Sequence, residues 1–284
     1  MNIGIIGLGL IGGSMARAIR RGTEHTVWGL DIREDTMEKA LLCGAVEERL
    51  SDARLGECDL VLLALTPTAL AEVAPRIAPL VKKGAVVVDL CGVKREPVAL
   101  LTPLARANGF LYIGGHPMAG REHGGFDHSS ADLFDNASMI LTPDETTDIH
   151  TLAMLKELFL AAGFRELKFS TPDEHDRTIA YTSQLAHVVS NAYVKSPTAL
   201  IHSGFSAGSF KDLTRVAFLD ENMWTSLFLA NRDHLTEELS ILMKNLGEYA
   251  DALEANDAER LRALLREGRL QKLASQEPER SLSK

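Results

Sequence analysis

A glycine-rich turn near the N-terminus limits what this chain can fold into more than any other segment. The apolar run that contains Ile3, Ile5 and Ile6 ends in Gly7-Leu8-Gly9-Leu10-Ile11-Gly12, and an alanine-rich helical pattern follows at once. Strand, glycine turn and helix in this order match the GxGxxG fingerprint of dinucleotide-binding α/β domains. In that fingerprint the first glycine permits the tight turn, the second lets the backbone approach a pyrophosphate, and the third lets the helix pack closely on the strand.

A second strand and an acidic residue supply the context that the motif needs. The strand pattern from Thr26 to Leu30 ends in Asp31, about 20 residues after the motif, where a carboxylate can accept hydrogen bonds from the adenosine ribose. The N-terminus of the first helix offers free N–H groups to the phosphates. A glycine turn in a non-binding α/β protein is the less favoured alternative. We therefore predict a dinucleotide site made of Gly7, Gly9, Leu10, Ile11, Gly12 and Asp31.

Composition narrows the class of protein. The 284 residues suffice for two domains, and 45% hydrophobic with 24% charged residues is ordinary for a soluble globular protein. A net charge of −9 argues against nucleic acid as a partner. The chain enters a strand pattern directly and has no apolar run near the roughly 20 residues of a membrane span, so we expect no signal peptide and no membrane contact. Three cysteines without a CxxC spacing indicate reduced thiols in a cytoplasmic protein.

Strand and helix patterns alternate from the N-terminus to Ser170. Strand patterns cover Cys58 to Leu65, Ala85 to Asp89 and Phe110 to Ile113, with helical patterns between them. This alternation predicts βαβ units with right-handed crossovers, and therefore an α/β fold with a Rossmann-type, mainly parallel sheet. We expect residues 1–170 to form the dinucleotide-binding domain.

The pattern changes at Thr171, where Thr-Pro-Asp-Glu reads as a capping box with proline at the first helical position. Only helical periodicity follows, which predicts an all-α domain over residues 171–284. The polar tail from Ser275 is expected to fray. One long helix carries an apolar stripe that favours a dimer seam and packing within the domain about equally. The stripe consists of Leu235, Leu239, Leu242, Leu246, Tyr249 and Leu253.

A few polar residues could carry chemistry. His116 follows a predicted strand at the sheet edge where ligands bind, and it could accept a proton or simply bond to loop backbone. Ser183 and His187 share one helix face, which favours a cleft over a solvated surface. Arg215 could bind a carboxylate through two parallel bonds or form a surface ion pair. No spacing of His, Cys or acidic residues matches a metal site, so we predict no metal.

Several longer motifs together resemble the prephenate dehydrogenase family. They are GLGLIGGS near the N-terminus, DLCGVK at 89–94, GGHPMAGRE at 114–122, the Ser183 and His187 pair, and GSFKDLTR from Gly208 with Trp224 beyond it. The resemblance covers nearly the whole chain. It implies a dinucleotide-binding domain followed by a helical dimerisation domain, and therefore a homodimer.

The resemblance also assigns roles by position. It makes His116 the catalytic histidine that hydrogen-bonds the ring hydroxyl of the substrate, and Arg215 the ligand of a substrate carboxylate. It implies that His187, Ser183 and Gly208 line the same pocket and that Glu122 and Asp212 stand at its mouth. One departure is Gly92, where many relatives carry a serine beside the histidine. A water molecule or Cys91 could replace that hydroxyl.

The implied reaction is the NAD-dependent oxidative decarboxylation of prephenate to 4-hydroxyphenylpyruvate in tyrosine biosynthesis. If His116 accepts the hydroxyl proton while the same ring carbon gives a hydride to nicotinamide, CO2 leaves and the ring becomes aromatic. NAD is expected rather than NADP, because Asp31 would repel a 2′-phosphate, although Arg33 could soften that preference. The sequence leaves open whether arogenate, with an amino group in place of the keto group, is the substrate. It also leaves tyrosine feedback and the dimer interface open.

Two other interpretations fit parts of the sequence. The β-hydroxyacid dehydrogenases resemble this architecture but use a lysine in the helical domain near the position of His187, and the missing lysine counts against them. A dinucleotide-sensing regulator without catalysis would not need His116, His187 and Arg215 together. Formation of NADH with prephenate would separate the two classes.

Overall fold

The computed structural model describes residues 1–276, and the predicted fraying of the tail concerns mostly residues outside that range. The chain divides into two compact units, Met1–His234 and Leu235–Lys284. The predicted domains, residues 1–170 and 171–284, were defined by their roles and not by compactness, and that division stays a prediction. Within residues 1–276 no helix is both long and apolar enough to cross a membrane.

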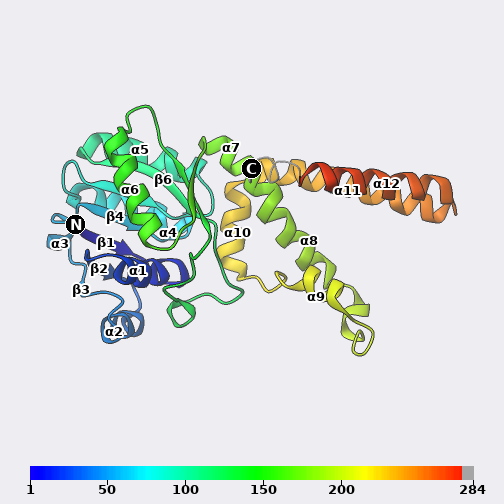
Figure 1. Ribbon diagram of the computed structural model, residues 1–284, viewed down its shortest axis with the longest axis horizontal. Coiled ribbons are helices and arrows are strands. Elements are labelled where there is room, and N and C mark those ends of the chain that lie inside the picture. Colours follow the sequence, from blue (N-terminus) through cyan, green and yellow to red (C-terminus); the bar gives the residue numbers. More distant parts are fainter. Residues whose placement is uncertain (277–284) are drawn as a thin grey trace. The chain divides into compact units, whose positions relative to one another are not determined.

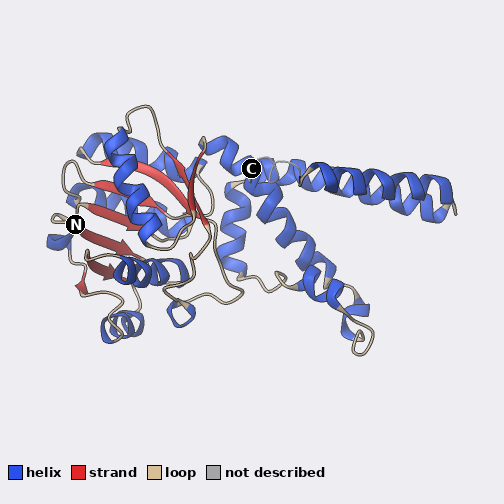
Figure 2. Ribbon diagram, viewed as in Figure 1, coloured by secondary structure: helices blue, strands red, loops and turns tan. Residues whose placement is uncertain are grey.

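The first unit contains one sheet of eight strands (Figure 1, Figure 2) with the order β3-β2-β1-β4-β5-β6-β7-β8. All neighbours are parallel except β6 and β7, which confirms the predicted Rossmann-type, mainly parallel sheet. The strands are β1 (Asn2–Ile6), β2 (Thr26–Leu30), β3 (Glu48–Arg49), β4 (Leu60–Leu63), β5 (Val86–Asp89), β6 (Leu111–Pro117), β7 (Ser138–Thr142) and β8 (Glu166–Phe169).

Helices cover both faces of the sheet, so both faces are buried. Successive side chains of a strand point to opposite sides, and each strand therefore contributes to both apolar clusters. In β5, Val86 and Val88 belong to one apolar cluster and Val87 to the other. Helices α1 and α6 pack on the first cluster, whereas α4 and α5 pack on the second. The helices along this sheet are α1 (Leu10–Gly22), α2 (Glu34–Leu42), α3 (Asp52–Leu55), α4 (Pro67–Ile77), α5 (Arg95–Asn108) and α6 (Ile149–Ala161), with short 3₁₀ turns at Ala78–Leu80 and Phe126–His128.

Strand β6 runs further than its sequence predicts. The apolar pattern ends at Ile113, but pairing continues through Pro117 because antiparallel β7 bonds alongside, with His116 opposite Ile140. A side chain at Gly114 would put its Cβ only 2.3 Å from Thr142 Oγ1, so glycine is needed where the strands approach. His116 is therefore part of a strand rather than of the loop after it. The sequence also suggests a helix end at Pro75, but this proline lies inside α4, which continues to Ile77.

The predicted helix start at Thr171 is confirmed, because the Thr171 side chain accepts a hydrogen bond from Glu174 N at 3.2 Å. The long helix is not regular, however. α7 (Pro172–Ile179) passes into a π-helical turn at Ala180–Leu185 and then into α8 (Ala186–Tyr193). A 3₁₀ turn at Pro197–Leu200, α9 (Gly208–Thr214) and α10 (Glu221–Ala230) follow. From Thr171 to Gln276 the structure contains helices and no strand, as predicted.

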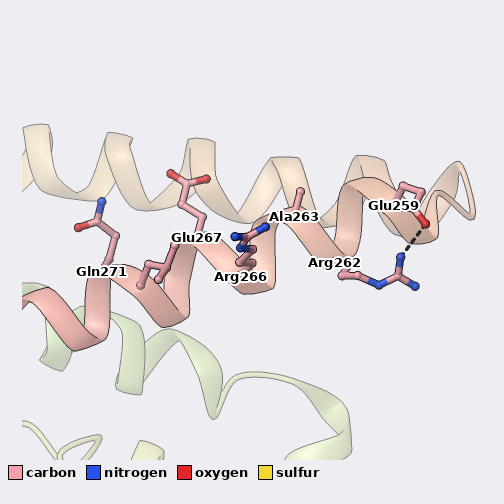
Figure 3. Close-up of a pocket in the computed structure, with 7 residues that line it drawn as sticks. Glu259, Arg262, Ala263, Arg266, Glu267 and Gln271 are labelled. Atoms are coloured by element: carbon pink, nitrogen blue, oxygen red, sulfur yellow. Dashed lines mark hydrogen bonds and ion pairs between the residues drawn. The ribbon is translucent and has the colours of Figure 1, made fainter.

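The second unit consists of helical residues from α11 (Arg232–Glu254) and of α12 (Ala258–Ala274). The turn between them uses Asn256 in the left-handed region and Asp257, which caps α12 by accepting from Arg260 N at 2.9 Å. Two members of the apolar stripe on α11, Leu246 and Leu253, are 58% and 64% exposed. One face of α12 forms the shallow depression of Figure 3, where Arg262 pairs with Glu259 at 2.6 Å. None of the predicted site residues lines it.

Candidate active site

The glycine turn between β1 and α1 has the local geometry that its sequence predicts. Gly7 has a φ of +88°, and a Cβ there would meet the carbonyl oxygen of Ala64 at 2.4 Å. A Cβ at Gly12 would meet Gly7 O at 1.8 Å, so only glycine allows α1 to sit this close to the strand. Around Gly9, by contrast, nothing lies within 4 Å of the same position. No side chain caps the start of α1, and its first N–H groups remain available to an anion.

Asp31 lies at the end of β2 and is tied to this turn. Its Oδ2 accepts from Leu8 N at 2.8 Å, and its Oδ1 accepts from Arg33 N at 3.0 Å. The Arg33 guanidinium stands 3.9 Å away. A pocket of about 310 Å³ adjoins the carboxylate and is bounded by the ends of β1 and β2, the segment after β3, and α4. Asp31 therefore lines this hollow and is bonded to Leu8 of the glycine turn, whereas the predicted cofactor residues from Gly7 to Gly12 do not line it.

The ends of β5 and β6 are joined by a buried ion pair. Lys94 and Asp89 are both fully buried, and the Lys94 ammonium donates to the Asp89 carboxylate and to the carbonyl oxygen of Gly115. The same carboxylate accepts from Tyr112 Oη at 2.6 Å and from Cys91 N at 2.9 Å. Every charge in the cluster is therefore compensated, as a buried pair requires. The cluster fixes the backbone immediately before His116.

His116 lies at this strand end with one ring nitrogen engaged. Its Nδ1 is 2.9 Å from His175 Nε2. A Cβ at Gly92 would lie 3.9 Å from His116 Nε2 and 3.3 Å from Leu227 Cδ2, so a serine hydroxyl at this position could have reached the ring. Burial, reinforced by His175 and by the positive charge of Lys94, holds the pKa of His116 well below its usual value.

The missing hydroxyl is not replaced by Cys91. Within residues 1–276 the hydrogen-bond partner of His116 is His175, which the sequence analysis did not single out. Burial raises the pKa of the Cys91 thiol to about 11, so this residue stays a neutral thiol. The only sequence signal for His175 is its place beside Asp176 in the first turns of the helix that Thr171 opens. Nothing local shows that this helix faces His116.

The helical part of the first unit places three of the predicted residues together. His187 Nδ1 lies 2.8 Å from the carbonyl oxygen of Ser183, and its ring lies against Trp224 with centroids 4.0 Å apart. Burial lowers the pKa of His187, and the nearby positive charge of Arg215 acts in the same direction. The arrangement leaves a largely neutral imidazole against an indole, with the guanidinium of Arg215 near enough to act on its pKa.

Helix α10, which the sequence predicted only as part of a helical stretch, lies near both histidines. Trp224 on this helix contacts His187, and Leu227, three residues later, lies beside Gly92 and His116. Residues three apart share a helix face, so one face of α10 borders both sites. Gln184 of the π-helical turn holds α10 in place by donating to Leu227 O at 3.1 Å.

Other predicted residues are less constrained by the structure. Gly208 begins α9 and Asp212 lies within it, both exposed, and Glu122 is exposed in the segment after β6. The structure places them without testing their proposed contacts with a substrate. Among residues 1–276 no group of three or more His, Cys, Asp or Glu could hold a metal ion.

A Rossmann-type sheet with a glycine loop, followed by helices that bring polar side chains to the strand ends, is typical of nucleotide-dependent dehydrogenases. Two family models match the chain, "Prephenate dehydrogenase, nucleotide-binding domain" over residues 15–167 and "Prephenate dehydrogenase, dimerization domain" over residues 171–267. The chain belongs to the prephenate dehydrogenase family, which confirms the resemblance seen in its motifs.

Curated relatives and solved structures agree. The chain is 32% identical over 285 residues to a cyclohexadienyl dehydrogenase of Zymomonas mobilis, covering 96% of this chain and 95% of the relative. It is 31% identical over 275 residues to a prephenate dehydrogenase of Lactococcus lactis, covering 93% and 75%. The crystal structure of a prephenate dehydrogenase from A. aeolicus, in complex with hydroxyphenyl propionate and NAD+, superposes with a TM-score of 0.82 at 29% identity, covering 96% of this chain and 98% of that one.

Two further solved structures are similar to this chain but carry other names. The arogenate dehydrogenase of Synechocystis matches with a TM-score of 0.77 at 28% identity, over 97% of this chain and 100% of that one. A 3-hydroxyisobutyrate dehydrogenase of Mycobacterium tuberculosis matches with a TM-score of 0.52 at 16% identity, over 93% and 90%. The second likeness shows a shared fold alone.

Proposed function

We propose that this enzyme oxidises prephenate with NAD and releases CO2, giving 4-hydroxyphenylpyruvate. The observation that carries the proposal is the setting of His116. Its Nδ1 is engaged by His175, while within residues 1–276 its Nε2 has no hydrogen-bond partner. This leaves one basic nitrogen for a substrate hydroxyl at the sheet edge where ligands of this fold bind. The relative from A. aeolicus, solved with hydroxyphenyl propionate and NAD+, supports the same chemistry.

NAD fits the residues at the glycine turn. The open space at Gly9 and the uncapped N–H groups of α1 suit a pyrophosphate, and the pocket beside Asp31 lies within the usual size range for a ligand group. We assign the adenosine to that pocket, with Asp31 accepting from the ribose hydroxyls through the lone pairs that Leu8 and Arg33 leave free. When bound, NAD supplies the hydride acceptor of the reaction.

The protein contributes a base that is neutral at physiological pH. Because the pKa of His116 lies well below its usual value, the imidazole is unprotonated from mildly acidic pH upward. Its Nε2 accepts the proton of the ring hydroxyl as CO2 departs and the ring becomes aromatic, and the imidazolium then returns that proton to the phenolate oxygen of the product. The fixed strand end, held by Lys94 and Asp89, keeps the ring in place without a neighbouring serine.

The helical residues are assigned to the rest of the substrate. Arg215 pairs with a carboxylate, and His187, which lies against Trp224, donates or accepts at the side arm. Ser183 and Gly208 complete the pocket wall, with Glu122 and Asp212 at its mouth. Residues 171–284 form the domain that contributes these groups and, by the dimerization model that matches residues 171–267, a homodimer contact.

Arogenate is the alternative substrate, and the arogenate dehydrogenase of Synechocystis is the observation that favours it. Steady-state rates with prephenate and with arogenate, each with NAD and with NADP, decide the matter. We expect NADH formation with prephenate, with NADP much the poorer acceptor. A clear preference for arogenate would make arogenate the substrate and leave the proposed oxidative decarboxylation unchanged. Failure with both substrates and both dinucleotides would refute the proposed function.

A further inference from the structure

A buried row of three side chains leads from His116 to the interior of the helical part. His116 Nδ1 lies 2.9 Å from His175 Nε2, and His175 Nδ1 lies 2.7 Å from Asp176 Oδ1. His175 is 2% exposed and Asp176 is fully buried. We propose that His175 and Asp176 form a positioning relay, which fixes the tautomer of His116 so that its Nε2 is always the basic nitrogen. The inference rests on the proposed function, because it concerns the base of that reaction.

The direction of the relay follows from the donors around Asp176. Its Oδ1 accepts from Lys94 N at 2.7 Å, and its Oδ2 accepts from Arg95 N at 2.9 Å. Although burial favours a neutral carboxyl, these hydrogen bonds and the one from His175 hold the pKa of Asp176 below its usual value. An ionised carboxylate only accepts hydrogen bonds. His175 therefore carries its proton on Nδ1.

The next step passes this constraint to His116. A neutral His175 with its proton on Nδ1 has a lone pair on Nε2. That lone pair can accept from His116 only if His116 carries its own proton on Nδ1. The remaining nitrogen, Nε2, then has the lone pair on the side of Gly92 and Leu227. The relay thus presets the base before any substrate binds.

The same row accommodates the charge that forms during turnover. When Nε2 takes the hydroxyl proton, His116 becomes an imidazolium, and its Nδ1–H still donates to His175. No second proton needs to move, and the positive charge faces the anion of Asp176 through a polarised imidazole.

The other charged groups near the relay are already paired. Lys94 is neutralised by Asp89, and Arg95 donates to Asp233 at 2.8 Å as well as facing Asp176. Burial lowers the pKa of His175, and Lys94 adds to this effect, while Asp176 opposes it. His175 therefore serves as a neutral acceptor at physiological pH rather than as a second cation.

Substituting Asp176→Asn tests the relay. The Oδ2 position faces two donors of Arg95, whereas the Oδ1 position faces one backbone N–H and His175. The amide nitrogen therefore settles toward His175 and inverts both tautomers, so that His116 Nε2 carries a proton. We expect turnover at saturating prephenate and NAD to fall about 100-fold or more, with both Michaelis constants changed by less than about threefold. The fall of turnover at low pH should move to lower pH, because the loss of a negative charge near the imidazolium lowers the pKa of His116.

Three further variants distinguish a loss of His116 positioning from a loss of folding. Asp173→Asn removes a carboxylate from the same helix that faces Arg95 at 3.6 Å but does not touch His175, and it should retain turnover. His175→Gln keeps an acceptor for His116 Nδ1–H, whereas His175→Phe keeps only the ring shape. We expect the glutamine variant to be at least about tenfold faster than the phenylalanine variant. Equal rates in these two variants, or an unmoved fall of turnover at low pH in Asp176→Asn, would overturn the relay.

The tautomers can also be read without turnover. In protein labelled with ¹⁵N-histidine, the NMR shifts of His116 and His175 should show both as neutral with the proton on Nδ1 near pH 8. His116→Asn and His175→Gln assign the two sets of signals. A proton on Nε2 of His116 in the unsubstituted protein would refute the relay even if prephenate were oxidised. The expected tautomers in a protein that oxidises neither prephenate nor arogenate would leave the relay standing and remove the proposed function.

Discussion

Replacing Lys94 by methionine should destabilise the first unit strongly, because it removes one partner of a fully buried ion pair. Lys94→Met fills the same space but leaves the Asp89 carboxylate without its counter-ion. Two donors to that carboxylate survive, Tyr112 Oη at 2.6 Å and Cys91 N at 2.9 Å. The carbonyl oxygen of Gly115 also loses its side-chain donor. The remaining bonds soften the loss but do not neutralise the charge.

The magnitude follows from the burial of both groups. Removing one member of a buried, hydrogen-bonded pair costs about 3 to 5 kcal/mol, and the two surviving donors place this case near the lower end. A loss of about 3 kcal/mol corresponds to a fall of roughly 6 to 12 °C in the midpoint of thermal unfolding for a unit of this size.

The assay is thermal and urea unfolding, followed by circular dichroism at several pH values. Lys82→Met is the control, because Lys82 pairs with Asp59 at 2.8 Å on the surface, with side chains 48% and 40% exposed. That change should cost less than about 1 kcal/mol. Adding Asp89→Asn to Lys94→Met should restore part of the loss, since the uncompensated charge is removed. A Lys94→Met protein within about 1 kcal/mol of the unsubstituted chain, or a double variant no better than the single one, would refute the reasoning.

Three further substitutions test the proposed site. His116→Asn should lower turnover by roughly 10² to 10⁴ and abolish the fall of kcat/KM at low pH. In the unsubstituted enzyme that fall should lie below the usual histidine range, because burial lowers the pKa of His116. If the fall persists in the variant, His187 becomes the candidate base. Asp31→Asn keeps an acceptor for Leu8 N, so the turn should stay folded. The variant should prefer NAD over NADP less strongly, because the negative charge is removed. An unchanged ratio of the kcat/KM values for the two cofactors would show that Asp31 does not set this preference. Arg215→Ala should raise the Michaelis constant for prephenate, with a loss of about 2 to 4 kcal/mol in binding if the pair is desolvated; a normal constant would assign the carboxylate to another cation.

The first half of the fold could be read from the sequence because its signals are local. The glycine turn, the strand from Thr26 to Leu30 and the buried run before Leu63 are each specified by neighbouring residues, and the structure has them nearly where they were predicted. The limits of β6 were missed because pairing with β7 decides them, and such pairing depends on residues far away in sequence.

The candidate site was predictable only in its parts. His116 and His187 could be proposed from motifs, but the contact between His116 and His175 joins residues 59 positions apart, and no periodicity encodes it. Helix α10 was likewise visible as helical sequence, whereas its position between the two histidines depends on tertiary packing. The glycine at position 92 is visible in the sequence, whereas the contact of His175 with Asp176 on one side and His116 on the other depends on tertiary packing.

The π-helical turn at Ala180–Leu185 makes the number of residues in this helix matter as much as their identity. A π turn holds one more residue than an α turn, so removing one residue there would give a regular α-helix in which the residues beyond keep nearly the same orientation. Removing one residue from α7 instead would rotate everything beyond it by about 100° and carry His187 away from Trp224. When the chain is aligned with relatives or its helices are grafted into another scaffold, a gap of one residue between His175 and His187 should therefore be placed in the π turn, because elsewhere in this stretch it would change the active site.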